Sequence, residues 1–298
     1  MRNKIWNSSS YILVVIFFIF SACTNRSLNY VNYYNKVNEI DSLYRLKKDT
    51  LITIKEYKKL FRKYPPKNQD RIEEFTNYII LADKKDINFG GKKNLKKLIT
   101  LIAPYHKTNK DFYWLYQKYG IDSLEVEQTV AQWKKNLNQK LVDSFTVAFK
   151  RDQDSRRSGN SSDIFKNDEK NAKLLKWMFE NDGFPSMQKI GLWNGDFFMP
   201  SGPVLLHMAD YDEYQPYFKA KILEYVKSGD CPPRDYAAMI DRNNIHHKQP
   251  YTYGVYQGYE NIKDTITVNR NRKSIGLPSI QHAQSIIKDF AKKNKKEK

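Results

Sequence analysis

Apolar residues recur at intervals of three and four positions along most of this 298-residue chain, from about residue 31 onward. That spacing places them on one face of an α-helix, because residues i, i+3 and i+4 lie above one another on successive turns. The clearest stripes are Val37, Ile40 and Tyr44; Tyr57, Leu60, Phe61 and Tyr64; Leu95, Leu98, Ile99 and Ile102; and Phe218, Ile222, Tyr225 and Val226. The pattern predicts a mainly α fold, with a helical N-terminal region and an α-helical C-terminal domain that contains one small β or irregular element. The rhythm of helix pairs is also typical of helical-repeat arrays, but no residue pattern recurs at a fixed period.

Start and stop signals give the predicted boundaries. One long helix is predicted over about residues 122–149. Residues 151–167 are rich in charge, serine, glycine and asparagine, which predicts a loop and an internal boundary. Asp168 is expected to be the N-cap of the next helix, since its side chain can accept from a backbone N–H. Residues 250–268, rich in tyrosine and glycine, are predicted to form a hairpin or irregular loop in which residues 265–268 are extended.

The N-terminus has the features of an export signal. Arg2 and Lys4 precede an apolar run that is too short for the ~20 residues that cross a bilayer. The run ends in Phe20-Ser21-Ala22-Cys23, which resembles the lipobox of bacterial lipoproteins, with Phe20 where that family commonly has Leu. The resemblance implies cleavage before Cys23 and acylation of its thiol, so that membrane lipid anchors the mature chain. A short N-terminal membrane anchor with an incidental cysteine is the alternative.

An exported chain meets different partners from a cytoplasmic one. The formal net charge of +18 would suggest nucleic acid in the cytoplasm. At the envelope the available partners are anionic lipid headgroups and anionic or carbohydrate polymers, and no nucleic acid is expected. Lysines that solvate helix faces are the simpler explanation of the charge.

With Cys23 acylated, Cys231 has no disulfide partner. We predict a lipid-anchored protein of the bacterial cell envelope, on the outer membrane in preference to the inner.

The C-terminal half contains an ordered set of short polar motifs. They are Asp152-Gln153-Asp154-Ser155-Arg156, Asp168-Glu169-Lys170-Asn171, Gly183-Phe184-Pro185 with Ile190-Gly191, His207, Asp241-Arg242, Gln249 with Tyr253-Gly254, and Arg272 with Gly276-Leu277. In this order they resemble the bacterial domain of unknown function 6624 family. The chain departs from that family at Phe184, where Trp is common, and after Tyr253-Gly254, where Val255-Tyr256 replaces a Gln. The resemblance implies a domain and a set of polar residues, and no activity comes with it.

The predicted organisation has five parts. They are a signal peptide (residues 1–22), a lipidated tether (23–30), a helical N-terminal region (31–149), the family-like domain (150–282), and a C-terminal helix end with a basic tail (283–298).

Gln153 and Arg156 lie three positions apart. On one helix they share a face and can present an amide and a guanidinium to one carboxylate or phosphate, as an anion clamp. The alternative is that Arg156 forms an interhelical ion pair with Asp168 or Asp241, because structural ion pairs have the same sequence signature.

His207 and Asp210 are one helical turn apart, and a His-x-x-Asp pair can orient an imidazole as a general base. A buried, hydrogen-bonded histidine is the plainer interpretation. A metal site would need His207 together with Asp210, His246 or His247, and two adjacent histidines cannot both point inward from one helix. No metal and no cofactor are therefore predicted.

Two classes of function remain, because the chain has no GxSxG motif, P-loop or glycine fingerprint. The preferred class is a ligand-binding or interaction module with a polar pocket. The alternative is a hydrolase of an envelope polymer or anionic small molecule, with His207 as base, Arg156 as oxyanion or phosphate partner and Asp241 as a further catalytic candidate. A purely structural lipoprotein is a third possibility. The candidate ligand-binding residues are Gln153, Arg156, Asp168, Asn171, His207, Asp241, Arg242, Gln249 and Arg272.

Overall fold

The computed structural model describes residues 28–69, 71–105, 108–208, 210–257 and 262–296. Within these ranges most of the chain is helical, which confirms the mainly α fold that the apolar spacing predicts. No helix in this part of the chain has both the length and the apolar character needed to cross a bilayer. The signal peptide, Cys23 and most of the tether lie outside the described residues, so their assignments stay predictions.

The N-terminal half is a series of short helices around one core. Asn29, Asp49 and Asp122 start three of them by accepting a hydrogen bond from a first-turn N–H. The apolar stripes then meet in a core rich in tyrosine, isoleucine and leucine, where Ile40 and Tyr57 are almost fully buried. The elements are α2 (Tyr30–Arg45), α3 (Thr50–Lys63), α4 (Glu74–Lys84), α5 (Gly91–Ile102), the 3₁₀ helix η1 (Thr108–Phe112), α6 (Tyr113–Lys118) and α7 (Ser123–Lys135).

The C-terminal half has its own core, which includes Phe145, Met178, Phe218 and Met239, and Val31 of α2 also packs into it. Its one sheet among the described residues is a two-stranded antiparallel hairpin in which Trp193 pairs with Phe198. The elements are α8 (Gln139–Ser158), α9 (Ser161–Asn181), α10 (Met187–Ile190), β1 (Trp193–Asn194), β2 (Phe197–Phe198), α11 (Ser201–His207), α12 (Gln215–Ser228), α13 (Pro233–His246), α14 (Thr265–Ile275) and α15 (Ile280–Lys296).

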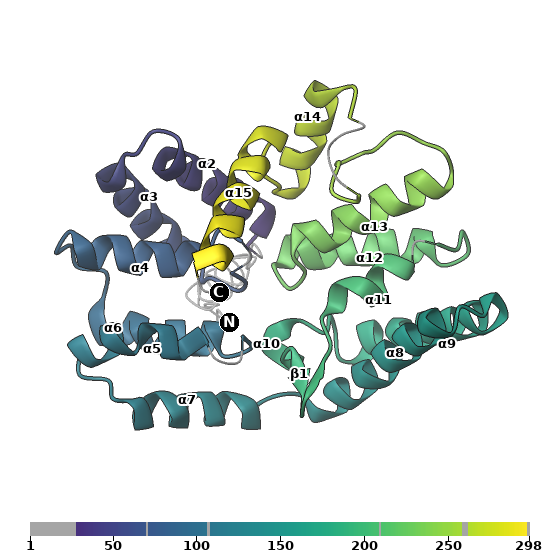
Figure 1. Ribbon diagram of the computed structural model, residues 1–298, viewed down its shortest axis with the longest axis horizontal. Coiled ribbons are helices and arrows are strands. Elements are labelled where there is room, and N and C mark those ends of the chain that lie inside the picture. The colour runs from purple at the N-terminus through teal and green to yellow at the C-terminus, as the bar shows by residue number, and fades with distance from the viewer. Residues whose placement is uncertain (1–27, 70, 106–107, 209, 258–261, 297–298) are drawn as a thin grey trace, which may run out of the picture.

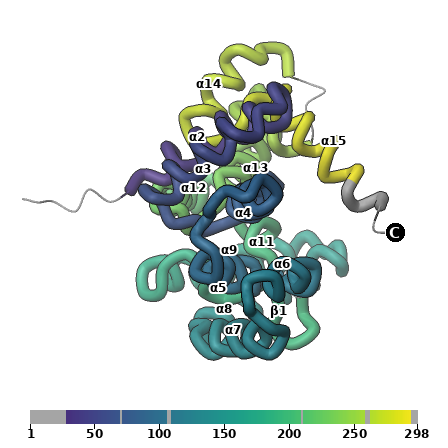
Figure 2. Tube along the Cα trace, turned by 90° about the vertical axis from the view of Figure 1, so that its left-hand side faces the viewer, coloured from purple at the N-terminus to yellow at the C-terminus, as the bar shows by residue number. Residues whose placement is uncertain are grey.

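The two halves lie side by side, with α2–α7 on one side of Figure 1 and α8–α13 on the other. Figure 2 shows α14 and α2 at one end of the molecule and α7 and α8 at the opposite end. Hydrogen bonds join the halves: the Asn68 amide donates to the Gly229 carbonyl over 2.9 Å, and the Gln188 amide donates to the Leu101 carbonyl over 2.8 Å. A Cβ on Gly229 would lie 2.5 Å from the Tyr30 ring, so glycine is required where α12 meets α2.

The last helix, α15, returns to the first described one. His282 Nε2 lies 2.7 Å from an oxygen of Asp41 on α2, and both side chains are buried. Arg45 donates to the same Asp41 oxygen over 2.7 Å and to Asp289 of α15 over 2.8 Å. These contacts tie the two ends of the described chain together.

Two predicted boundaries are wrong. The helix expected over 122–149 is interrupted at residues 136–138, because the Asn138 side chain accepts from the Leu141 N–H and starts α8. Residues 151–167, expected to form a loop, are helical apart from a tight turn. Gly159 makes that turn with a φ of +68°, and Asn160 caps the first turn of α9. Most of the charged and serine side chains of this segment lie on the exposed faces of two helices, whereas Asp152 and Ser155 are buried.

Two further local predictions also fail. Asp168 lies inside α9 and is not an N-cap. Residues 265–268 are not extended: they begin α14, because Asp264 accepts from the Thr267 N–H and this cap outweighs the β preference of threonine and valine. Residues 250–257 are irregular, as predicted, and the small β element lies at residues 193–198.

Candidate functional site

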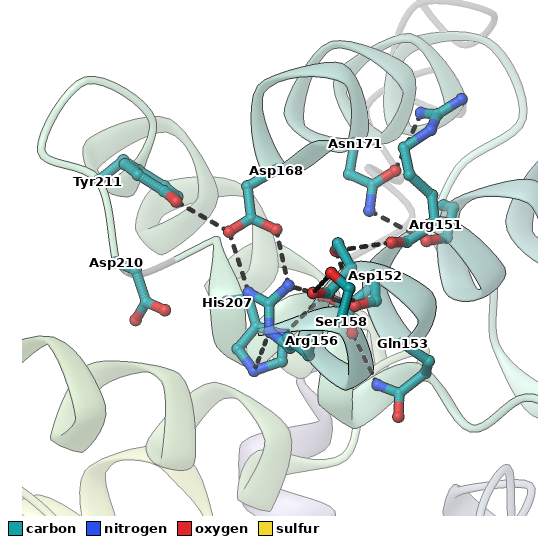
Figure 3. Close-up of polar contacts among 12 residues, drawn as sticks. Arg151, Asp152, Gln153, Arg156, Ser158, Asp168, Asn171, His207, Asp210 and Tyr211 are labelled. Atoms are coloured by element: carbon teal, nitrogen blue, oxygen red, sulfur yellow. Dashed lines mark hydrogen bonds and ion pairs between the residues drawn. The ribbon is translucent and has the colours of Figure 1, made fainter. Parts of the chain in front are cut away.

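Polar side chains from α8, α9 and α11 meet in one cluster, the α8–α9–α11 network (Figure 3). Asp152 and Arg156 are four positions apart on α8, so they share a face. Asp168 reaches them from α9 and His207 from the last turn of α11. Asp152 and Asp168 are fully buried, and His207 is 9% exposed. Four residues separated by up to 55 positions in sequence thus form one buried polar network.

Arg156 is the centre of this network. Its two terminal nitrogens donate to the two oxygens of Asp168 over 3.0 and 2.9 Å, a bidentate pair. Nη1 also lies 2.9 Å from Asp152 Oδ1. The interhelical ion pair with Asp168, one of the two alternatives in the sequence, is therefore present. Gln153 does not complete an anion clamp, because its amide donates to Asp152 over 2.7 Å.

Both ring nitrogens of His207 have a partner within the network. Nδ1 lies 2.6 Å from Asp152 Oδ1, and Nε2 lies 3.1 Å from the Nε of Arg156. Because an arginine Nε–H can only donate, Nε2 must be the unprotonated acceptor, and the ring hydrogen belongs on Nδ1, where it faces Asp152. This arrangement fixes a neutral tautomer, with the nitrogen that a general base would use already occupied by Arg156.

Asp210 is not the partner of His207. The Asp210 carboxylate accepts from Arg242 over 2.6 and 2.7 Å and lies 3.3 Å from His246. Figure 3 shows Asp210 apart from the network. The predicted His207–Asp210 dyad is therefore wrong: the partner is Asp152, which comes from a different helix and which the sequence reading did not single out.

Tyr211 closes the network on its outer side. Its hydroxyl donates to Asp168 Oδ2 over 2.9 Å, and its ring packs edge-on against Phe165. Burial raises the pKa of Tyr211, and the hydrogen bond to Asp168 and its charge raise it further. Tyr211 therefore stays protonated and continues to donate at neutral pH.

Asn171 ties α9 to α8 beside the network. Its side-chain nitrogen donates to the Ala148 carbonyl and its oxygen accepts from Arg151, each over 3.0 Å. Since both ends of the buried amide are satisfied within the protein, Asn171 serves helix packing in this structure.

Asp241 and Arg242 have different partners, as their angular separation on a helix predicts. Asp241 is fully buried and accepts from the backbone N–H groups of Thr252, Tyr253 and Val255 over 2.6–3.0 Å. Burial raises the pKa of Asp241, and these N–H groups oppose the rise. The carboxylate thus organises the irregular loop. Arg242 bonds Asp210 and the Tyr256 hydroxyl.

The last two candidates lie away from the network. Gln249 is exposed. Arg272 is only 2% exposed and donates to the carbonyls of Pro278, Tyr253 and Gly254, which fixes the loop against α14. The nine candidates therefore do not form one pocket: Gln153, Arg156, Asp168 and His207 meet in the network, and Asp241 and Arg272 hold the 252–256 loop.

No cluster of His, Cys, Asp or Glu suited to a metal ion occurs among the described residues. His246 contacts Asp210 and His247 contacts Asp212, so neither joins His207.

Cys231 is fully buried, and burial raises the pKa of its thiol well above the ordinary value.

A cavity lies between the two halves of the molecule, and of the sequence candidates only Arg272 lines it. Its walls come from α2, residues 68–74, the start of α13, Val255, residues 272–278 and α15. The lining residues are Tyr34, Val37, Asn38, Asn68, Arg71, Ile72, Glu74, Pro232, Pro233, Arg234, Val255, Arg272, Gly276, Leu277, Pro278, Ala283, Ile286 and Ile287. A second cavity shares Asn68, Pro232 and Arg234 with it and extends toward β2 and α11.

Two polar groups in the first cavity stand out. The Tyr34 hydroxyl is buried and has no hydrogen-bond partner among the described residues. The Asn68 side chain lies beside it, and one N–H of the Asn68 amide donates to the Gly229 carbonyl. Arg234 is half-buried, and no ion pair or hydrogen bond of its guanidinium is found in the described part of the chain. Arg272 is the one sequence candidate that lines this cavity; Tyr34 and Arg234 carry no sequence signal, because the lining comes from six separated segments.

Comparison of the chain with protein-family models, with curated proteins and with solved structures gave no match. The resemblance to the domain of unknown function 6624 family and the predicted domain boundaries therefore stay predictions.

Proposed function

We propose that this chain is a membrane-anchored ligand-binding or interaction module of the bacterial cell envelope, and that its ligand site is the cavity between the two halves. The anchor follows from the lipobox-like segment ending at Cys23. One observation supports the choice of site: Arg234 lines both cavities and lacks a partner among the described residues, whereas Arg156 and Arg242 are each paired with buried or half-buried carboxylates.

The contrast matters because a desolvated arginine is costly unless something compensates its charge. In the α8–α9–α11 network the protein supplies that compensation itself, through Asp152 and Asp168. At Arg234 a ligand can supply it. Concave, mostly apolar sites with a few convergent polar groups are the usual form of small-molecule sites, and the Tyr34 hydroxyl adds a second such group.

A hydrolase based on His207 is less well supported. The Asp152–His207 pair has the orientation that a general base needs, but Arg156 occupies the reactive nitrogen at 3.1 Å. For His207 to take a proton from water or substrate, Arg156 would have to leave both His207 and Asp168. That movement would break a bidentate ion pair between helices.

Mass spectrometry of the native protein tests the proposal. The full chain is expressed in a bacterium with lipoprotein processing, purified from membranes in a neutral detergent, and measured under native and denaturing conditions. We expect an acyl adduct on Cys23 and a non-covalently bound small molecule that is lost in the Tyr34→Phe/Arg234→Gln variant. Loss of the same molecule in a His207→Gln variant but not in the cavity variant would move the site to the network and contradict the proposal.

A further inference from the structure

We infer that the cavity takes a small organic anion, with its single anionic head at Arg234 and its apolar body between α2 and α15. This inference rests on the proposed function and adds the chemical class of the ligand. Three properties of the cavity support it: the charge of its lining, the polarity of its walls and its size.

The charge of the lining is positive. Three arginines and one glutamate border the cavity among the described residues. The glutamate, Glu74, already accepts from the Tyr33 hydroxyl over 2.7 Å. Arg234 lies in the first turn of α13, where the free backbone N–H groups of a helix also favour negative charge. A cationic head would therefore be repelled, and a neutral head would leave the Arg234 charge uncompensated.

The walls around this charge are apolar. The cavity is lined by Val37 of α2, Ile286 of α15, and Ile72 and Leu277 from the segments before α4 and α15. Ile287 also lines it, with 36% of its surface exposed. Burying an apolar body here is favourable at roughly 25 cal/mol per Å² of apolar surface removed from water. An inorganic anion would leave this apolar lining in contact with water, so the ligand needs an apolar part as well as an anionic head.

The cavity is small. Its interior volume of about 100 Å³ holds several water molecules, since one water needs roughly 10–15 Å³. Gly276 and Tyr34 approach each other closely in its lining, since a Cβ at position 276 would lie 2.6 Å from the Tyr34 Cβ. A short alkyl or aryl carboxylate matches such a space, whereas a polymer chain does not.

Isothermal titration calorimetry with four defined probes tests the inference. Hexanoate, hexanol, hexylammonium and acetate are titrated into the full chain in neutral detergent, so that the micelle is a common background. We expect hexanoate to bind at least about tenfold more tightly than the other three, since a hydrogen bond to a charged group changes affinity by about that factor or more.

Matched variants identify the residues responsible. Arg234→Gln should weaken hexanoate binding about tenfold or more and leave hexanol binding unchanged. Tyr34→Phe should weaken hexanoate binding by a few-fold. Arg270→Gln is the control, because Arg270 is exposed on α14 and does not line the cavity. An unchanged melting temperature shows that each variant is folded.

Several outcomes would overturn the inference. Equal binding of hexanol, preferred binding of hexylammonium, absence of hexanoate binding, or hexanoate binding that Arg234→Gln does not weaken would each exclude a small organic anion at Arg234. If native mass spectrometry still finds a neutral or cationic molecule that the cavity variant loses, the ligand class is wrong and the proposed function stands. If neither experiment finds a ligand, both fail.

Discussion

The Nε–H of Arg156 lies 3.1 Å from Nε2 of His207, on the ring nitrogen that would have to be free for base catalysis. The same guanidinium bridges Asp152 and Asp168, so the imidazole is one part of an ion-pair network that joins three helices. Substitution of a residue in such an ion-pair network is expected to change mainly the free energy of unfolding.

Removing Arg156 should destabilise the protein strongly. Arg156→Gln leaves Asp152 and Asp168 buried without their cation, and breaking one side of a buried pair costs about 3 kcal/mol at the lower end of the known range. We expect the lower end, because the Arg156 side chain is 22% exposed. Urea denaturation checks this value, and Arg157→Gln is the control, since Arg157 is exposed on the same helix turn. Equal stability of the two variants would contradict a structural role for the network.

Asp241 should be needed for the shape of the 252–256 loop. In Asp241→Ala three backbone N–H groups lose their acceptor, and we expect a loss of roughly 2–4 kcal/mol in the free energy of unfolding, because each unsatisfied buried donor costs about 1–3 kcal/mol before water enters. Hydrogen exchange of the Thr252, Tyr253 and Val255 amides should accelerate in this variant. Asp212→Ala, at an exposed position, should change neither quantity.

Gly276 should not tolerate alanine. Its φ of +91° is unfavourable for any side chain, and the added Cβ would approach Tyr34. We expect Gly276→Ala to lose about 2 kcal/mol or more of stability. Gly159→Ala is the matched control: it also has a positive φ of +68° but open space around the new Cβ, so it should lose only about 1 kcal/mol. Equal losses would show that packing against Tyr34 contributes nothing.

Cys231 should be inert in the folded protein. Its thiol is fully buried, and the resulting rise in pKa keeps it protonated. Alkylation by iodoacetamide, followed by mass mapping of the peptide that contains Cys231, should show modification only after unfolding in denaturant. Rapid modification of the native protein at neutral pH would mean that the thiol is accessible.

Stability should fall between pH 10 and pH 12. Burial, followed by the charge of Asp230, raises the pKa of Tyr30 to about 12, and burial raises that of Tyr225 to about 12. In this window the unfolded chain releases tyrosine protons that the folded chain keeps, so rising pH favours unfolding. The melting temperature should drop across the window and less steeply in Tyr30→Phe. A flat profile would contradict the raised values.

The sequence predicts the helices of this protein well, and the reasons are local. Pro65-Pro66 ends α3, Gly229 ends α12 and Pro232-Pro233 starts α13, because proline cannot continue a helix but fits its first turn, and glycine adopts the positive φ of a helix end. The failures are also local. Asn138 and Asp264 start helices within segments whose composition predicts one continuous helix and an extended stretch, because a single cap residue outweighs the composition around it.

The candidate site was predicted only in part, because tertiary contacts are not visible in spacing. His207 was paired with its sequence neighbour Asp210, whereas its partner, Asp152, lies 55 positions earlier. Asp152 stands four residues before Arg156, and that spacing on one helix was the available signal. Arg234 and Tyr34 could not be found in this way, because they lie 200 positions apart and only the tertiary fold places both of them in the lining of one cavity.

The contact between Asp41 and His282 has a consequence for biosynthesis. Until α15 leaves the ribosome, the buried carboxylate on α2 lacks one of its two neighbours, and the cavity lacks one wall. A nascent or truncated chain that stops before Ile280 therefore exposes apolar surface of α2 to proteases and chaperones. Quality control can in this way distinguish a finished molecule from an unfinished one.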